Sequence, residues 1–511
     1  MLCFAMARVE RRWAHDEQTQ AWMQTPRNDL VHEQADPDGA FSLVGGPFRS
    51  YRRQVIIDGD SLIERTRFRL AIPWFGWLMV PFVWLTLRRA PGPRRFSGHQ
   101  PGWAPPARLD ARSGTVLGLL AGASLIVGYV NTLFTQTVAL TQREFHFSNT
   151  GQGTAGVVVR LGVVLALPFV FRADRNGRKA MVVVTAASSI CLTVLGAVAP
   201  SFALLTATQT LGRPLGLALD VLILVIAAEE MPPGARAYAV SVLAMSTGLG
   251  SGFCVMALPL ADIGPRAWRL LYVLPVLLLV IVVDLARRLP ESRRFSATHA
   301  TPSTVANRRL AIVASVSFFG NMFVAPASFF QNRYLRDIRH FDAKHVALFT
   351  LVTATPAGLG IFLGGRLADR RGRRMVGIGG IALGTSALLC SFAIGGWPMW
   401  IFAFLGGFIG GAGYPAVQVY RSELFPTGNR GRAGGLIVTA ALVGGSIGLL
   451  TTGPLLDRGY GYAKALALAA IGEMIAAIII WRTFPETARR ELEEINPEDA
   501  IGTGGPIIPA T

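Results

Sequence analysis

The sequence predicts an all-α integral membrane protein: twelve transmembrane helices in two pseudo-symmetric six-helix bundles, preceded by an N-terminal extension. Three observations predict this class: a low charge content, a series of long apolar runs and an internal repeat. Of the 511 residues, 51% are hydrophobic and only 16% are charged. A soluble protein carries about 25% charged residues. Composition alone therefore places the chain among membrane proteins.

Twelve apolar runs of roughly 18 to 25 residues begin after position 113, each long enough to cross a bilayer as a helix. They lie near 114–138, 151–171, 180–199, 202–228, 237–259, 268–288, 309–331, 344–365, 376–395, 398–420, 434–456 and 462–482. The net charge is +18. Because the basic residues flank the apolar runs, we expect loops that face anionic lipid and no nucleic-acid partner.

Loop charge predicts the orientation. The loops after even-numbered runs, up to the tenth, hold 19 Lys and Arg, whereas the opposite loops hold eight. Positive loops stay in the cytoplasm, so both termini are expected there, in a multi-pass protein of the cell membrane. We expect a monomer in the lipid bilayer.

An internal repeat divides the chain into two halves. "ADRNGRK" from Ala173 returns as "ADRRGRR" from Ala368, and "LPES" from Leu289 returns as "FPET" from Phe484. "EEMPPGARA" returns as "SELFPTGNRGRA", which pairs Glu229 with Glu423 and Arg236 with Arg430 at nearly the same offset. The predicted domains are 1–113, 114–288, a linker 289–308, 309–483 and a cytoplasmic tail 484–511.

The extension, 1–113, follows a different pattern. Apolar and polar residues alternate over 48–70 around Asp58-Gly59, which predicts a β-hairpin. An apolar, Trp-rich segment follows at 70–87, with arginines on both sides. We expect it to lie in the inner membrane interface or to re-enter the membrane. A thirteenth span is the alternative, but one more crossing would invert the orientation above.

The repeated loop predicts a latch between the two bundles. A helix start exposes unpaired N–H groups that an aspartate can bind, and arginines can bind carboxylates at other helix ends. Such contacts would form when the bundles close on the cytoplasmic side. The alternative is a loop that only sets topology. The candidate gating residues are Asp174, Arg175, Gly177, Arg178, Glu229, Arg236, Glu291, Gly365, Asp369, Arg370, Gly372, Arg373, Glu423, Arg430 and Glu486.

These motifs resemble the major facilitator superfamily. "GRLADRRGRR" at 365–374 matches the loop motif of that family, and "ADRNGRK" matches in part, since Val170 stands where the first glycine is expected. "YRSELFPTGNRGRAGG", "WRLL", "LPESRR" and "FPET" resemble its sugar-porter and organic-acid-porter branch. The resemblance implies two bundles around a central cavity, alternating access, and loop charges that lock the cytoplasmic gate in the outward-facing state.

Ionisable and polar residues inside the runs are the candidate substrate and proton sites. Arg160 and Asp220 lie about 18 Å and about 13 Å from the cytoplasmic edge, counted at about 1.5 Å per helical residue. Ala354 and Tyr414 occupy the equivalent positions of the second half, which predicts that the charge chemistry belongs to the first half. A structural ion pair is the alternative role. The full set is Arg160, Arg213, Asp220, Asn131, Gln136, Asn321, Gln331, Tyr414 and Gln418.

The leading functional hypothesis is a proton-coupled carrier for a small polar solute, an organic acid or a sugar-like metabolite. The seventh run lacks the Gln-Gln pair of sugar porters, and "GYVNTLF" has Asn131 where those proteins often carry an acid. A drug or metabolite exporter and a transporter-like sensor are the alternatives. The sequence has no HExxH, GxSxG or P-loop motif, and its histidines have no ligand spacing, so we expect no enzyme, metal or cofactor.

Overall fold

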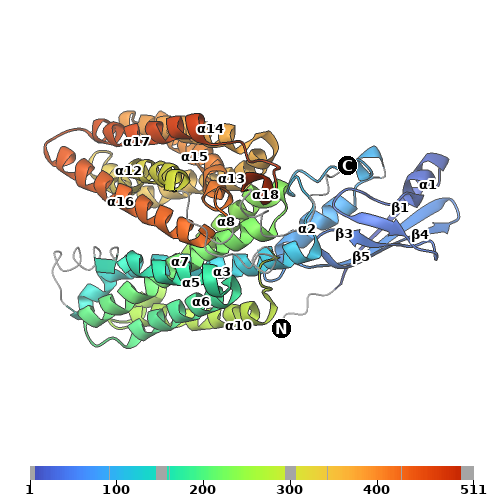
Figure 1. Cartoon of the computed structure of the whole chain (residues 1–511), viewed down its shortest axis with the longest axis horizontal. Coiled ribbons are helices and arrows are strands. Elements are labelled where there is room, and N and C mark those ends of the chain that lie inside the picture. The colour runs from blue at the N-terminus through green and yellow to red at the C-terminus, as the bar shows by residue number, and fades with distance from the viewer. Residues whose placement is uncertain are drawn as a thin grey trace. The chain divides into compact units, whose positions relative to one another are not determined.

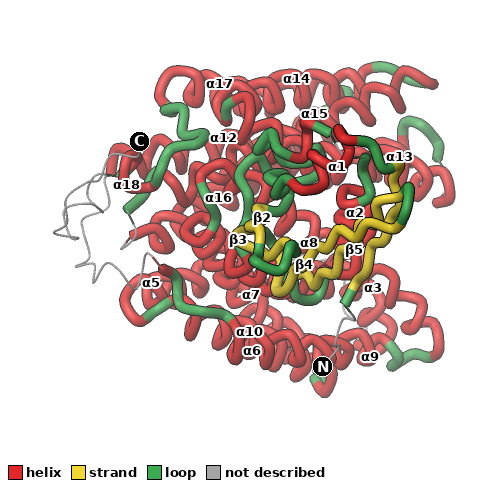
Figure 2. Tube along the Cα trace, turned by 90° about the vertical axis from the view of Figure 1, so that its right-hand side faces the viewer, coloured by secondary structure: helices red, strands yellow, loops and turns green. Residues whose placement is uncertain are grey.

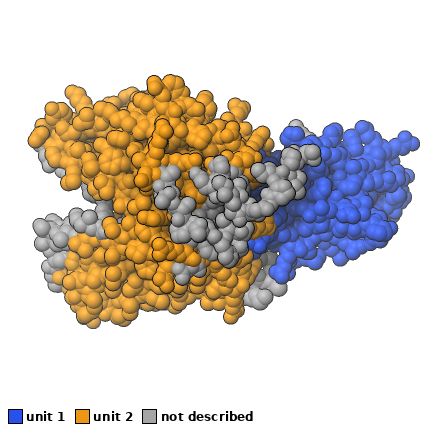
Figure 3. All heavy atoms as spheres, viewed as in Figure 1, with its two compact units in different colours: residues 1–122, 230–235 blue, residues 123–229, 236–511 orange. Residues whose placement is uncertain are grey.

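The computed structural model describes residues 6–90, 92–145, 158–159, 162–293, 307–341, 343–426 and 429–496. The chain forms two compact units. The first comprises residues 1–122 together with 230–235, and the second comprises 123–229 with 236–511 (Figure 3). The first unit therefore contains the extension, the start of the first long helix up to Gly122, and one short interhelical loop.

The extension contains an antiparallel sheet (Figure 2), and its strand order is β1-β5-β4-β3-β2. Its strands are β1 (Ala7–Ala14), β2 (His32–Ala35), β3 (Phe41–Gly45), β4 (Phe48–Asp58) and β5 (Ser61–Leu70). β4 and β5 form a hairpin that closes at Asp58 opposite Ser61, with Gly59 in the left-handed region (φ 56°). The prediction of a single hairpin missed β1 to β3: β1 carries four charged residues among eight, and β2 and β3 are only four and five residues long.

Two helices accompany the sheet, α1 (Glu17–Gln24) and α2 (Gly76–Leu87). Val83 and Leu87 of α2 join the apolar core that Phe48, Tyr51 and Phe68 build on the sheet. Buried ion pairs lie in the same unit: Arg53 binds Glu33 at 2.6 Å, and Arg95 binds Glu64 at 2.9 Å. Such charges are tolerated inside a protein only when they are paired and hydrogen-bonded.

Helices account for most of the predicted runs. They are α3 (Ala111–Phe145), α5 (Leu167–Asn176), α6 (Arg178–Leu195), α7 (Phe202–Glu230), α8 (Arg236–Ala257), α9 (Trp268–Val273), α10 (Leu279–Arg288), α12 (Asn307–Asp337), α13 (Ala343–Arg371), α14 (Arg373–Ala393), α15 (Trp397–Glu423), α16 (Arg430–Asp457) and α17 (Tyr462–Thr483). α9 and α10 are joined by the 3-10 turn Leu274–Leu278, so together they cover the sixth run.

Among the described residues, ten helices are long and apolar enough to cross a membrane. The eighth predicted run corresponds to α13, which is helical throughout. Much of the second run lies outside the described residues, and its described part comprises a 3-10 turn (Gly162–Ala166) and α5.

The helices of the second unit form two groups (Figure 1). α12 packs against α16 and α17, and α14 packs against α15. In the first half of the sequence, Tyr129 of α3, Leu205 of α7, Cys254 of α8 and Tyr272 of α9 share one buried cluster. Contacts between the groups involve α8 with α13 and α15, and α5 with α16.

The segment expected to be a tail is in part built into the fold. Thr487, Leu492 and Asn496 are buried, and α18 (Leu492–Ile495) follows the last long helix. The Asn496 amide donates a hydrogen bond of 2.7 Å to the Glu423 carbonyl at the end of α15. Most of the linker expected at 289–308, from 294 to 306, lies outside the described residues.

Candidate transport site

One network of buried charges joins the two halves at the ends of their helices. We call it the charged loop network and define it as Arg178, Glu229, Arg236, Asp369, Arg373, Glu423 and Arg430, all of which are at most 4% exposed. Sequence analysis nominated every one of these residues. The structure joins them in two clusters, one around Glu229 and one around Glu423.

Glu229, near the end of α7, is the acceptor of the first cluster. Its carboxylate forms ion pairs with Arg178 of its own half and with Arg430, the first residue of α16 in the other half. Ser292 donates a further hydrogen bond of 2.5 Å to it. A single buried carboxylate therefore holds a cation from each half.

Glu423, at the end of α15, repeats this arrangement in the second half of the chain. It pairs with Arg373 of its own half and, at 3.2 Å, with Arg236 at the start of α8 in the other half. Arg373 also donates to the backbone and side chain of Thr487, at 3.2 and 3.0 Å. The two interhalf pairs, Glu229–Arg430 and Glu423–Arg236, thus use residues at corresponding positions.

Asp369 binds a helix start, as the sequence pattern predicts. Its Oδ2 accepts the backbone N–H of Tyr238 in the first turn of α8, at 3.1 Å, and its Oδ1 accepts from Arg373 at 2.9 Å. Burial raises the pKa of Asp369, although the Arg373 guanidinium opposes that rise. Asp174 holds the corresponding position of the first half, but its side chain lies outside the described part of the structure.

Glu291 and Glu486 were expected to bind arginine side chains, and the structure shows them at helix starts. They accept backbone N–H groups at the starts of α6 and α14, with Arg178 N and Arg373 N each 2.9 Å away. The preceding Gly177 and Gly372 have φ values of 100° and 107° and no side chain to cap the helix. Each distant glutamate therefore supplies the acceptor that the helix start lacks.

Gly365, the first residue of the complete loop motif, lies where α13 meets α8. A Cβ at this position would lie 2.0 Å from the Ser241 hydroxyl and 2.6 Å from the Ala237 carbonyl. In the other half Val170 replaces this glycine, and the small residue is found on the partner helix instead. A Cβ on Gly435, which corresponds to Ser241, would lie 3.7 Å from Val170. The larger Val170 in the first half is therefore accommodated by Gly435 on the partner helix.

Other gating candidates lie outside this network. Arg175 and Arg370 are exposed. Within the first unit, Glu230 binds Arg112 of α3 at 3.0 Å, and the carbonyl of Gly234 accepts from Ala107 at 3.3 Å. The loop between α7 and α8 is therefore bonded to the segment that leads out of the extension.

A second group of polar residues, which we call the deeper polar group, consists of Asp220 of the first half and Tyr414 and Arg421 of the second half. Asp220 of α7 interacts electrostatically with Arg421 and Tyr414, which both belong to α15. Tyr414 is 44% exposed and interacts electrostatically with Asp220 of the other half. The sequence predicts the charge chemistry in the first half alone. The structure adds Arg421, a charged residue of the second half, to this group.

The remaining candidates differ in their surroundings. Asn131 of α3 faces α7, since a Cβ on Gly216 would lie 3.3 Å from its Oδ1. Asn321 donates to the Ser317 carbonyl at 3.0 Å, which ties it to its own helix. Gln136 is exposed, whereas Arg213, Gln331 and Gln418 are half-buried. Arg160 lies outside the described residues.

Sequence reasoning missed two ionisable groups. Arg421 was counted as a loop charge because it lies just before Glu423. Glu473 lies in the middle of α17, is 7% exposed and faces α12, where a Cβ on Gly320 would lie 3.8 Å from its carboxylate. A glutamate inside the apolar run 462–482 was the signal that could have found it.

The opposite ends of the first-half helices carry a separate cluster. Glu144 accepts from Trp268 Nε1 at 2.8 Å and from Arg269 at 2.9 Å. Burial acts to raise the pKa of Glu144, but the hydrogen bonds from Arg269 and Trp268 outweigh it, so the pKa is lowered. Arg269 also donates to the Ala199 carbonyl at 2.9 Å. Trp268 and Arg269 of the "WRLL" motif thus connect the start of α9 with the end of α3 and with the turn at Ala199.

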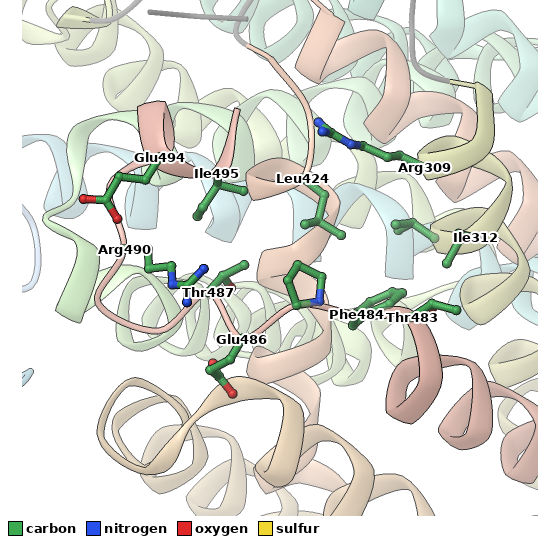
Figure 4. Close-up of a pocket in the computed structure, with 12 residues that line it drawn as sticks. Arg309, Ile312, Leu424, Thr483, Phe484, Glu486, Thr487, Arg490, Glu494 and Ile495 are labelled. Atoms are coloured by element: carbon green, nitrogen blue, oxygen red, sulfur yellow. The ribbon is translucent and has the colours of Figure 1, made fainter. Parts of the chain in front are cut away.

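A small pocket of about 230 Å³ opens beside the charged loop network (Figure 4). Arg309 of α12, Phe484 and Glu486 after α17, and Arg490 and Ile495 of the following segment line it. Glu486 already caps α14, so this pocket borders the network and does not contain the deeper polar group.

Comparison with known proteins identifies the family. The model of the Major Facilitator Superfamily matches residues 119–353 and 310–503. The chain belongs to this superfamily. It is therefore a multi-pass membrane transporter and not an enzyme.

The chain is similar to transporters of small polar solutes. IolF of Bacillus subtilis (strain 168), a minor myo-inositol transporter, is 26% identical over 415 residues, which are 76% of this chain and 90% of IolF. The cis,cis-muconate transport protein of Acinetobacter baylyi is 25% identical over 382 residues, 69% of this chain and 92% of that protein. The proton:xylose symporter XylE, solved with 6-bromo-6-deoxy-D-glucose, has the same fold at 17% identity and a TM-score of 0.66, covering 76% and 99% of the two chains.

Proposed function

We propose that this transporter carries a small polar solute by alternating access and is driven by a proton gradient. The observation that carries the proposal is the charged loop network. Its interhalf pairs, Glu229–Arg430 and Glu423–Arg236, can exist only when the ends of the two bundles meet. Breaking and re-forming them is the step that alternating access requires.

The same proposal concerns the topology and the location of the protein. Twelve spans in two pseudo-symmetric halves would place the charged loop network in the cytoplasm, because its loops carry the excess of basic residues. Both termini would then be cytoplasmic in a monomer of the cell membrane. The network would close the cytoplasmic end and leave the solute site accessible from outside.

Relatives and interior residues together indicate the solute and the coupling. Two of the transporters named above carry a polyol and a dicarboxylate, which are both small and polar. Asp220 supplies a carboxylate deep in a membrane span, and such residues commonly carry protons in transporters. We therefore assign the coupling proton to Asp220.

α2 is proposed to lie in the membrane interface. Its 12 residues extend about 18 Å, which is short of the roughly 30 Å hydrocarbon core. Trp77, Phe82 and Leu85 are 57%, 47% and 59% exposed, while Val83 and Leu87 pack on the sheet. Within the first unit, Pro73 packs against Gly118 of α3, which anchors this segment beside the start of a membrane span.

Proteoliposomes test the transport proposal. We expect uptake of myo-inositol or cis,cis-muconate to rise with an inward proton gradient and to fall when a protonophore is added. Asp220→Asn should abolish accumulation against a gradient. Asp284→Asn is the matched control, since the ion pair of Asp284 in the described part of the chain is with Arg288, one turn away. Wild-type uptake that does not respond to the proton gradient would contradict the proposal of proton coupling.

A further inference from the structure

The deeper polar group also indicates the chemistry of the solute, and this inference rests on the proposed function. We infer that Arg421 binds a carboxylate of the solute, and that Asp220 in the opposite half takes up the coupled proton when that carboxylate arrives. Three features support it: the surroundings of Arg421, those of Asp220, and the charge balance between the two.

Arg421 has no salt-bridge partner among the described residues. Its Nε is buried and has no hydrogen-bond partner in that part of the structure. Its one hydrogen bond there is a long contact of 3.4 Å from Nη2 to the Ser317 hydroxyl. Sequestering a guanidinium in a membrane protein is unfavourable unless an anion compensates for it. The planar guanidinium favours a carboxylate, which it can bind through two parallel hydrogen bonds.

The face of α15 that carries Arg421 is polar. Tyr414, Gln418 and Arg421 are spaced four and three residues apart, which places them on one side of the helix. The buried Gln418 Oε1 has no hydrogen-bond partner among the described residues. A guanidinium, a carboxamide and a phenol on one face suit a solute that carries a carboxylate together with another polar group.

Asp220 faces this set from the other half. It interacts electrostatically with Arg421, yet no salt bridge or hydrogen bond to Asp220 is found within the described ranges of the chain. Arg421 and Tyr414 are the charged or titratable side chains within its electrostatic reach in those ranges. The two opposite charges therefore attract each other without a direct hydrogen bond between them in the described ranges.

Charge balance couples the solute to a proton. Without solute, the negative charge of Asp220 compensates for the positive charge of Arg421. A bound carboxylate neutralises Arg421 and places a second negative charge near Asp220, and two close carboxylates do not both stay ionised. Asp220 therefore takes a proton from water as the solute binds. By linkage, a proton on Asp220 favours carboxylate binding to the same degree.

Binding to the purified full-length protein tests this inference. Isothermal titration at one pH in two buffers of different ionisation enthalpy measures the protons taken up per ligand. The probes are cis,cis-muconate, succinate and benzoate, with myo-inositol and xylose as uncharged controls. We expect at least one carboxylate to bind the wild type with proton uptake near one, and this arm needs no variant.

The variants separate the two roles. Arg421→Gln should weaken carboxylate binding about 100-fold, because a charged partner of the ligand is lost. Arg421→Lys should weaken carboxylate binding less than Arg421→Gln does. Asp220→Asn should retain carboxylate binding but lose the proton uptake. The inference is overturned if no carboxylate binds, if Arg421→Gln binds as tightly as the wild type, or if Asp220→Asn still takes up the proton.

These results are distinguishable from failure of the proposed function. Gradient-driven uptake of myo-inositol without carboxylate binding would overturn the inference and leave proton-coupled transport standing. Carboxylate binding that depends on Arg421, together with proteoliposomes that show no gradient-driven flux, would support the inference and overturn proton-coupled transport.

Discussion

Neutralising Glu423 should open the closed end of the transporter. Glu423 is fully buried and binds Arg236 of the other half at 3.2 Å, as well as Arg373 of its own half. In Glu423→Gln, both guanidinium groups would lose their shared anion while they remain buried. Breaking a buried pair in this way costs about 3–5 kcal/mol. Once the bundles part, water can solvate Arg236, so most of this cost falls on the closed state.

The size of the effect follows from that cost. A loss of about 3 kcal/mol shifts an equilibrium roughly 100-fold, since about 1.4 kcal/mol is tenfold. The Tyr238 amide is a local reporter, because it donates at 3.1 Å to Asp369 of the opposite half from the first turn of α8. First-turn amides have no acceptor within their own helix. Hydrogen exchange in peptides covering 236–241 should therefore accelerate by up to about 100-fold when opening limits the exchange.

Two variants complete the design. Glu494→Gln is the control, because Glu494 is exposed on the neighbouring segment. In the double variant Arg236→Gln with Glu423→Gln, the acceleration of hydrogen exchange should be smaller than the product of the two single accelerations. The reason is that each single substitution removes the same contact. Exchange in Glu423→Gln that does not exceed that in Glu494→Gln would refute the assignment of this pair to the closed state.

Three further predictions concern other parts of the molecule. Asp369→Asn should leave membrane insertion intact but reduce uptake in proteoliposomes, because the bonds to Tyr238 and Arg373 weaken; Asp174→Asn should be better tolerated, and equal losses would contradict the asymmetry of the two loops. Gly365→Val should reduce transport, because a Cβ would lie 2.0 Å from the Ser241 hydroxyl and overpacking costs about 1–3 kcal/mol; Gly358→Val is the control, since nothing lies within 4 Å of a Cβ there. Glu144 has a lowered pKa in the folded state, so its contribution to stability is present above the usual value of 4.5 and is lost as pH falls below it; thermal unfolding from pH 7 to pH 3 should show this loss in the wild type and less of it in Glu144→Gln.

The repeated loop shows how far sequence patterns reach into the site. The nearly constant offset between the two copies identified Glu229, Arg236, Glu423 and Arg430 as a set, and the structure joins them in two interhalf pairs. The pattern did not distinguish which acid meets which base. Glu291 and Glu486 were expected beside arginine side chains, whereas they cap the starts of α6 and α14.

The extension marks another boundary of sequence reasoning. Alternation of apolar and polar residues located the β4–β5 hairpin, because a long strand with one buried face repeats every two residues. The strands β2 and β3 are too short to establish a period, since they cover only His32–Ala35 and Phe41–Gly45. The place of β3 in the sheet depends on its pairing with β4, and that of β2 on its pairing with β3, rather than on their own patterns.

The sequence by itself determined the class of this protein. Length and apolarity of a run decide whether it can cross a bilayer, and both are local properties. Only the tertiary structure decided that Arg421 faces Asp220 from the other half and that Val170 lies opposite Gly435. Each of these contacts depends on which helix faces approach one another. In each pair, one residue comes from the first half of the chain and the other from the second. No local pattern carries that information, because the approach is set by the packing of whole helices.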